Sequence, residues 1–341
     1  MGTEGVGAQA RPVAPAGRRD EARMILRRVA RGFFRTSSPD AAAGLTFYAL
    51  LSVIPTLIAA FSVVGLVGAK KDGVQAVLDI AEDVLHTDVL AGITRPIEQI
   101  ASLAGAGWVL IASLVVAVWS VARYVTALGR AINRLYGVPE GRMLWKAKPV
   151  HLLVTLAVFV FVFVLVTLAA IIAALSRPVA QSLGRVIGAG DVMLQVWRIA
   201  RWPVLVLIVV LVIAILYYFA PNIVHPHFRL VSVGAIIAVL ILAVASAGFA
   251  FYVRDLGAYD RIYGSFAGIM IFLVWLWIGN MALLLGAGFD AEIERVRELR
   301  RGIPAERELQ VEVRDTRRTE RNAANDAADE RAARRLRRSR R

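Results

Sequence analysis

Long apolar runs are the feature that most constrains how this chain can fold. Six of them contain almost no charged residue, at about 41 to 68, 104 to 126, 150 to 175, 201 to 220, 230 to 254 and 265 to 289. Roughly 20 helical residues cross the hydrocarbon layer of a bilayer, and backbone amides in lipid must be bonded within their own segment. The predicted fold class is therefore all-α, a polytopic membrane protein with six transmembrane helices.

Charged residues are segregated from these runs. The 341-residue chain is 58% hydrophobic and still has a formal net charge of +14. Its basic residues gather before the first run, in the loop after the second run and behind the last run, which lie on one side of the membrane if there are six spans. Because cytoplasmic loops are enriched in Lys and Arg, we expect the N- and C-termini to be cytoplasmic.

The same segregation divides the chain into three regions. Residues 1–20 are rich in Gly, Ala, Pro and Arg and are expected to form a disordered arm, and residues 21–297 form the six-helix membrane domain. Residues 298–341 mix acidic and basic side chains, which is typical of a charged, partly disordered cytoplasmic tail. Helical spacing of apolar residues also predicts short amphipathic helices in the outer loops, within 74–100 and 179–199.

A cationic helix is predicted before the first run. Apolar residues from Ala22 to Phe33 share one helical face, and the opposite face is basic, with Arg23, Arg27, Arg28, Arg31 and Arg35. Such a helix is suited to lie on the anionic inner leaflet of the membrane. The alternative is an orientation signal with no further role.

Ionisable side chains are nearly absent from the runs themselves. Arg123 and Asp290 both fall near expected inner ends of spans, where a long side chain reaches the headgroups and pairing is ordinary. A proton relay or an ion-coupled path of carboxylates at the bilayer midplane is therefore poorly supported.

Uncharged polar and helix-breaking residues are more common in the runs. Those that could line a cavity or a substrate path are Thr46, Ser52, Pro55 and Asn280, together with the deeply placed Trp275. Pro55 lacks an amide hydrogen and is expected to kink the first helix beside Ser52. The alternative for each residue is that it hydrogen-bonds one helix to another.

Patterns that would carry catalysis or bind a metal are weak. Cysteine is absent, which excludes thiolate catalysis and a cysteine zinc site. His151, His225 and His227 lie near the expected inner face, but no catalytic spacing of carboxylates accompanies them, and the chain has no Gly-rich phosphate loop or nucleophile elbow. We predict no metal site, no cofactor and no enzymatic activity.

Four motifs occur in order along the chain. They are AAGLTFYALLSVIP at 42–55, AINRLYGV at 131–138, YYFAPN at 217–222, and a stretch from 251 to 265 that continues through 275–277 and 284–292. Together they resemble the YihY/BrkB family of bacterial membrane proteins, over roughly residues 25–297. The resemblance implies a six-helix, multi-pass protein of the bacterial cytoplasmic (inner) membrane. Members of this family were once labelled ribonuclease BN, a label that the family no longer deserves.

The motifs also extend the set of candidate residues. Phe47 and Tyr48 join the candidates for the cavity or substrate path. The resemblance implies structural roles for a second group, which contains Asn133, Tyr136, Pro221, Asn222, Tyr252, Tyr259, Tyr263, Gly264, Ser265, Gly286 and Asp290.

The leading functional hypothesis is a transporter or lipid-handling protein in envelope biogenesis. Without a charged midplane site, an amphiphile that slides between helices fits better than a small ion. The expected partners are membrane lipids and the anionic headgroups of the inner leaflet; no specific nucleic acid is expected, and assembly into a homo-oligomer is left open. The alternative is a non-transporting scaffold or regulator, and an intramembrane enzyme or ribonuclease is the least favoured class.

Overall fold

The regular secondary structure in the described part of the chain is helical. The computed structural model describes residues 17–66, 106–143, 149–150, 152–157, 190–224, 232–254 and 267–339. The helices in these ranges are α1 (Arg18–Arg35), α2 (Ser38–Leu66), α5 (Ala106–Tyr136), α7 (Gly190–Phe219), α8 (Val233–Arg254), α10 (Ala267–Arg300) and α11 (Arg317–Ser339). Within the same ranges the one β-type contact is an isolated bridge between Ile223 and Val313, so the predicted all-α class is confirmed.

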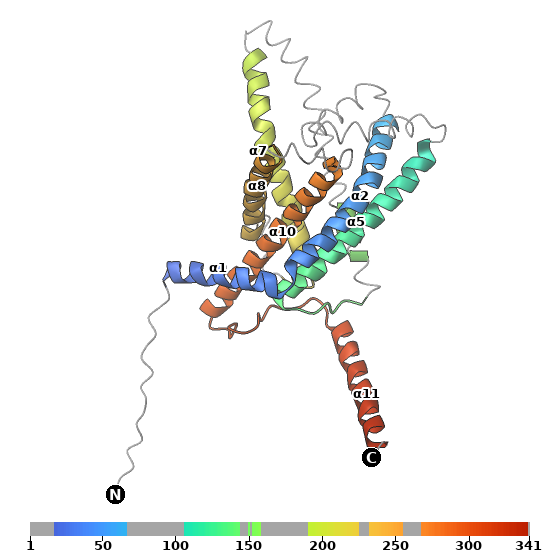
Figure 1. Ribbon diagram of the computed structural model, residues 1–341, viewed down its shortest axis with the longest axis vertical. Helices are drawn as coiled ribbons and strands as arrows, with labels where there is room; N and C mark the ends of the chain where they lie inside the picture. Colours follow the sequence, from blue (N-terminus) through green and yellow to red (C-terminus); the bar gives the residue numbers. More distant parts are fainter. Residues whose placement is uncertain are drawn as a thin grey trace.

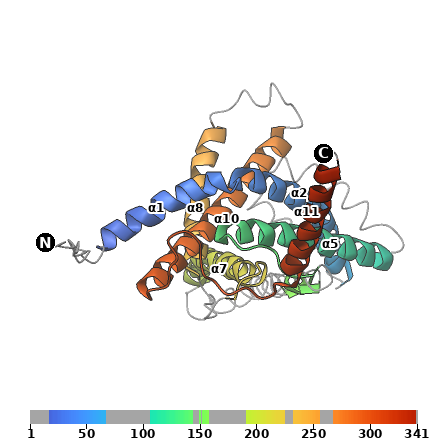
Figure 2. The same cartoon turned by 90° about the horizontal axis from the view of Figure 1, so that it is seen from below.

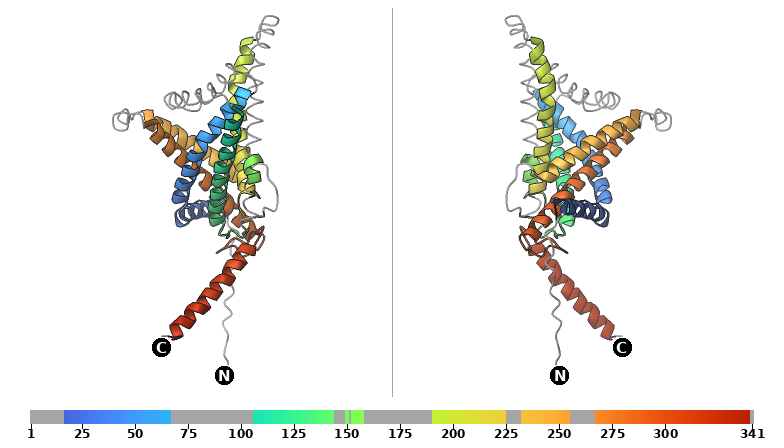
Figure 3. Two further views of the ribbon diagram at one scale, coloured as in Figure 1. Left: turned by 90° about the vertical axis from the view of Figure 1, so that its right-hand side faces the viewer. Right: turned by 90° about the vertical axis from the view of Figure 1, so that its left-hand side faces the viewer.

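The long helices are arranged in pairs. Helix α2 packs along α5, and α8 packs along α10, while α10 also contacts α2 (Figure 1). Helix α1 lies crosswise at one end of this bundle, where it contacts α10 and the start of α2 (Figure 2). Helix α11 leaves the bundle at that same end and points away from it (Figure 3). We call this the inner end, because the basic flanks of the expected spans lie there.

Three described helices are long and apolar enough to cross a membrane. They are Ile111–Tyr136, Val233–Tyr252 and Gly268–Arg300, and Val206–Phe219 is a shorter apolar helix. The expected span at 104–126 differs in one respect, because α5 continues ten residues further, to Tyr136. Arg123, which was expected near an inner end, therefore lies well inside the helix. The predicted outer-loop helix within 74–100, the first part of the one within 179–199, and most of the expected span at 150–175 lie outside the described residues. Residues 190–199 form the start of α7, which therefore begins before the expected span at 201–220.

Buried and exposed apolar side chains separate the protein core from the lipid-facing surface. The largest fully buried side chains include Leu45, Leu128, Ile132 and Leu284, contributed by α2, α5 and α10. Large apolar side chains on the other faces are exposed, among them Val115, Trp119, Leu240, Val244 and Phe251. Helices whose solvent is lipid need no polar outer face, so this distribution fits a membrane domain.

Close approach of two backbones joins α8 to α10. A Cβ atom added at Gly234 would lie 2.3 Å from the carbonyl oxygen of Gly286, and one added at Gly286 would lie 2.4 Å from that of Gly234. Such spacing is open only to glycine, and small residues at helix crossings are a common device in membranes. Gly286, a residue of the last motif, therefore sets how closely α8 and α10 pack.

This crossing yields a prediction about stability. Substituting Gly234→Ala should push α8 away from α10 and lower the free energy of unfolding by about 1–3 kcal/mol, as overpacking of a core does. The matched control is Gly248→Ala on the same helix, where an added Cβ meets nothing within 4 Å. Thermal unfolding in detergent measures both; equal melting temperatures for the two variants would contradict the tight crossing.

Candidate functional site

A neutral polar cluster joins three helices inside the membrane domain. The side-chain amide of Asn280 on α10 donates to the hydroxyl oxygen of Thr46 on α2, at 3.1 Å, and to the carbonyl oxygen of Leu276, at 2.9 Å. Tyr124 on α5 donates its hydroxyl to Oδ1 of Asn280 at 2.8 Å, and Thr46 donates to the carbonyl oxygen of Ala42 at 2.8 Å. The cluster satisfies its own donors and acceptors, so it holds the helices together.

Sequence reasoning selected Thr46 and Asn280 but missed Tyr124. The missing signal is spacing, because Ala117, Ser120, Tyr124 and Leu128 recur at three- and four-residue intervals on one face of α5. Ala117, Ser120 and Leu128 are buried, and a tyrosine on such a face needs a partner for its hydroxyl.

The other candidates for a substrate path do not meet at one place. Phe47 is 57% exposed, and Tyr48 lies edge-on beside it. Ser52 donates to the carbonyl oxygen of Ala49 at 2.7 Å, and Pro55 lies half-buried within α2. Trp275 donates its indole N–H to Ser246 at 3.1 Å, which links α10 to α8.

A small cavity of about 110 Å³ lies at the inner end, between α5, α7, α10 and the start of α8. Its lining is amphipathic and includes Tyr136, Tyr217, Ser232, Asp290, Glu294 and Arg301. A water molecule occupies about 30 Å³ of liquid, so the cavity has room for a few waters or a small polar group.

Asp290 holds the start of α8 at this cavity. Its carboxylate accepts hydrogen bonds from the hydroxyl of Ser232 and from the backbone N–H of Gly234, the latter at 2.7 Å. Ser232 in turn accepts from the N–H of Ala235 at 3.0 Å, as an N-cap residue does. At the start of α8, Asp290 of α10 thus accepts the N–H of Gly234 and Ser232 accepts that of Ala235, and Asp290 also places a carboxylate at the positive end of the helix dipole.

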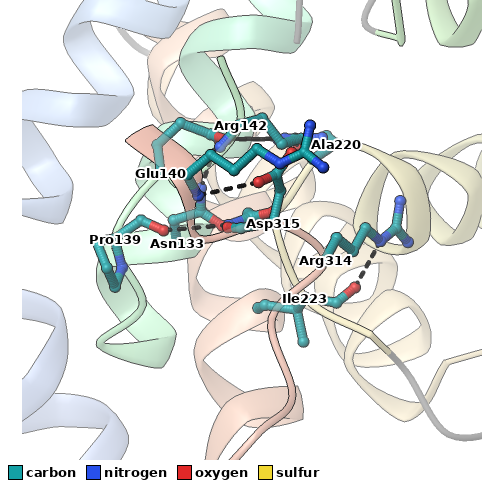
Figure 4. Close-up of polar contacts among 10 residues, drawn as sticks. Asn133, Pro139, Glu140, Arg142, Ala220, Ile223, Arg314 and Asp315 are labelled. Atoms are coloured by element: carbon teal, nitrogen blue, oxygen red, sulfur yellow. Dashed lines mark hydrogen bonds and ion pairs between the residues drawn. The ribbon is translucent and has the colours of Figure 1, made fainter. Parts of the chain in front are cut away.

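A second polar network lies beyond the inner ends of α5 and α7 (Figure 4). Asn133 accepts the backbone N–H of Asn222 at 2.8 Å and donates to the carboxylate of Glu140 at 3.0 Å. Glu140 forms an ion pair with Arg142 at 2.8 Å, and Arg142 donates to the carbonyl oxygen of Ala220 at 2.8 Å. Two residues from different motifs, Asn133 and Asn222, therefore meet and join the helix ends.

The segment after α10 folds back onto this network. Asn222 donates its side-chain amide to the carbonyl oxygen of Asp315 at 2.9 Å, and its carbonyl oxygen accepts the N–H of Arg314 at 3.2 Å. Arg314 also donates to the carbonyl oxygen of Ile223 at 2.8 Å and lies over the ring of Tyr218. Burial lowers the pKa of the Arg314 guanidinium, and the nearby charge of Arg142 lowers it further.

The chain after residue 298 is therefore not one solvated tail. Ala305 and Leu309 are buried, and Val311 and Val313 pack against the core, whereas α11 buries no residue. The alternating apolar residues 309, 311 and 313 could have revealed the packed part, because period-two spacing is typical of an extended, half-buried segment. The many charged residues on either side of 309–313 make this period-two pattern difficult to recognise in the sequence.

Helix α1 places most of the predicted inner-leaflet arginines on its surface. Arg23, Arg27, Arg31 and Arg35 are exposed, while Arg28 is half-buried and forms an ion pair with Glu292 of α10 at 2.8 Å. The helix is anchored to the bundle by Val29 and Phe33, which are buried, and it exposes Leu26 and Phe34, at 58% and 73%.

The remaining motif residues are distributed over several places. Pro221 is fully buried beside Asn222, and Tyr136 is buried at the cavity. Tyr252 is 56% exposed near the far end of α8. Tyr259, Tyr263, Gly264 and Ser265 lie outside the described residues, as do His151, His225 and His227. Across the ranges that the structure covers, no group of three or more His, Asp or Glu side chains could hold a metal ion.

Comparison with known proteins gives consistent matches over most of the chain. The family model described as "Virulence factor BrkB" matches residues 29–310. The "Putative ribonuclease-like protein YfkH" of Bacillus subtilis (strain 168) is 28% identical over 75% of this chain and 90% of its own length. UPF0761 membrane proteins of Azoarcus sp. (strain BH72) and Aromatoleum aromaticum are 28% and 29% identical; the matches cover 83% and 82% of this chain and 66% and 67% of the relatives. No solved structure matches the chain significantly.

The neutral cluster predicts energetic coupling between α5 and α10. In a double-mutant cycle of Tyr124→Phe and Asn280→Ala, the two losses of stability should be less than additive, with a coupling of roughly 0.5–1.5 kcal/mol. Each single change leaves a buried partner unpaired, so the second change costs less than the first. Unfolding in mixed micelles provides the four free energies; strict additivity would mean that the hydrogen bond contributes nothing.

The folded-back segment gives a prediction about protease sensitivity. A Cβ atom at Gly141 would lie 1.8 Å from the carbonyl oxygen of Asp315, so Gly141→Ala should detach the segment. Detachment would expose the half-buried Arg314 and free the backbone at Arg307, whose side chain is already exposed, for cleavage by trypsin. The control is Gly32→Ala, at a position where an added Cβ has open space. Mass spectrometry of timed digests should show at least several-fold faster cleavage at these arginines in Gly141→Ala alone; unchanged cleavage would place the segment elsewhere.

Proposed function

The chain belongs to the Virulence factor BrkB family, and from that premise we propose that it is a transporter or lipid-handling protein of the bacterial inner membrane that acts in envelope biogenesis. Its standing as a membrane protein rests on its membrane-protein relatives and its apolar helices. The finer parts, six spans with both termini in the cytoplasm, are supported by the distribution of Lys and Arg between the ends of the expected spans.

The surface of α1 is the observation that carries this proposal. Four exposed arginines share this helix with the exposed apolar side chains of Leu26 and Phe34. A helix of this kind lies in the membrane interface, with its apolar side chains among the acyl chains and its cations at the headgroups. The ion pair of Arg28 with Glu292 fastens the helix to α10. Helix α1 would therefore gather anionic lipid beside the membrane domain.

The interior of the bundle supports an amphiphile over a small ion as the cargo. Where α2, α5 and α10 meet, the side chains that hydrogen-bond from one helix to another are the neutral ones of Thr46, Tyr124 and Asn280. Ion-coupled transport needs an ionisable or otherwise free polar site at this depth. A lipid that moves along the surface of the bundle needs none, because its acyl chains stay in the hydrocarbon.

Helix α11 favours a second class, a scaffold or regulator without transport. It is 23 residues long, points away from the bundle (Figure 3) and buries none of its residues. A helix of this kind would offer a surface to another protein. We propose no cofactor and no enzymatic role; the ribonuclease-like name belongs to the Bacillus subtilis relative.

A transport assay tests the proposal. Full-length protein is reconstituted into vesicles with labelled phospholipids of neutral and anionic headgroups, and the fraction of label accessible to an impermeant quencher is followed over time. The protein should accelerate exchange between the leaflets. No acceleration for any headgroup, relative to protein-free vesicles, would overturn the proposal.

If α1 gathers anionic lipid, removing its charges should slow the exchange of lipid between the leaflets. The triple variant Arg23→Gln, Arg27→Gln and Arg31→Gln should slow exchange several-fold in vesicles with anionic lipid, since each surface cation contributes about 1 kcal/mol to attraction by the leaflet. The matched control removes three exposed charges from α11, at Arg331, Arg335 and Arg338. An equal loss of exchange in the α1 variant and the α11 control would contradict a specific role for the charges of α1.

A further inference from the structure

Three arginines form a row, which we call the file, along the outer face of α5. All three are exposed: Arg123, Arg130, which follows it by seven residues, and Arg134, which follows it by eleven. With about 3.6 residues per turn, these intervals are close to two and three full turns, so the three side chains leave the helix on one side. The buried residues Ala117, Leu128 and Ile132 lie on the opposite side of α5.

The file extends from the inner end into the apolar part of the helix. Arg134 is two residues from the inner end of α5 at Tyr136, whereas Arg123 is thirteen residues from it, which corresponds to about 20 Å along the axis. Beyond Arg123 the same face carries the exposed side chains of Val116 and Trp119. A cation at such depth on a surface that faces lipid is costly and normally has a partner or a function.

No partner for these charges appears among the described residues. The ion pairs there involve other arginines, and none includes a residue of the file. The guanidinium of Arg123 instead lies over two aromatic rings, 4.7 Å from the centre of Trp119 and 5.8 Å from that of Tyr48 on α2. A cation–π contact of this kind holds the guanidinium at the surface without using its N–H groups as hydrogen-bond donors to a carboxylate.

We propose that this file is a track for the phosphate of an anionic phospholipid, along which the headgroup moves from the inner leaflet toward Arg123. The inference rests on the proposed function and names its substrate class. One guanidinium group can donate two parallel hydrogen bonds to two oxygens of a phosphate. The headgroup would therefore move along α5 by leaving one arginine and binding the next. The exposed valines, Trp119 and the neighbouring Phe47 provide an apolar surface for the acyl chains.

The sign of the charges decides between headgroups. A zwitterionic lipid carries an ammonium group that would need an acidic partner, whereas the three side chains of the file are all cations and none of them forms an ion pair with a described carboxylate. The inner-end cavity differs, because Asp290 and Glu294 share it with Arg297 and Arg301. A headgroup with negative charge alone therefore fits the file. A soluble phosphate would gain nothing from the apolar flanks, which is why the occupant is a lipid.

The lipid preference of the purified full-length protein tests this inference apart from transport. Spin-labelled phosphatidylglycerol and phosphatidylcholine report the fraction of each lipid that the protein immobilises. The wild-type protein should prefer phosphatidylglycerol, and Arg123→Gln should reduce that preference about fivefold, which is the factor expected for one interfacial cation. Arg123→Lys should keep part of the preference, and Trp119→Leu should weaken it. The control, Arg331→Gln on α11, removes an equal charge and should have no effect.

Several outcomes would overturn the track. One is an unchanged preference in Arg123→Gln. Another is loss of the phosphatidylglycerol preference in millimolar inorganic phosphate, which would identify a site for free phosphate. A third is a change of oligomeric state in Arg123→Gln without a change in lipid preference, which would show that a second copy of the chain covers the file.

The transport assay separates this inference from the proposed function. If the wild-type protein moves lipid and Arg123→Gln moves it equally fast, the track fails and the proposed function stands. If the wild-type protein moves no lipid yet keeps an Arg123-dependent preference, the anionic-lipid site stands and the proposed function fails.

Discussion

The hydrogen bonding of polar groups in the absence of water is the constraint on which this structure depends. In lipid, a polar side chain must find its partner within the protein. Asn280 does so by joining α2, α5 and α10, and Asp290 by accepting the N–H of Gly234 and the hydroxyl of Ser232 at the start of α8. Because these hydrogen bonds use the polar groups between the helices, the interior polar groups hold the helices together. Charged side chains without an ion-pair partner lie on the surface.

The inner end is subject to a related requirement: the backbone groups that helix ends leave without partners must be hydrogen-bonded by other parts of the protein. Asn222 follows α7 and satisfies groups from two parts of the chain, namely Asn133 in α5 and the consecutive residues Arg314 and Asp315 after α10. A chain segment that lies beyond the last membrane helix is thereby built into the domain. This explains why the charged region splits into a packed part before 317 and a projecting helix after it.

The sequence predicts the features that depend on length and composition and misses those that depend on position. Long apolar runs are sufficient to predict helices, but Arg130, Asn133 and Arg134 do not end a helix, so α5 continues past its expected limit. Isolated polar residues such as Thr46 and Asn280 stand out among apolar ones, although whether they line a path or bond to each other depends on helix rotation. The packing of 309–313 does not follow from composition, because only the alternation of apolar residues distinguishes this segment from the charged residues around it.

The extension of α5 also changes where charge can act. Placed near an inner end, Arg123 would be an ordinary cation that reaches the headgroups; placed well inside the helix, it lies among exposed apolar side chains with an aromatic support. The carboxylate of Asp290, by contrast, is occupied by the start of α8, so it is less free to recognise a ligand. The two ionisable groups that the sequence singles out thus divide their roles: Asp290 holds the helices, and Arg123 faces the lipid.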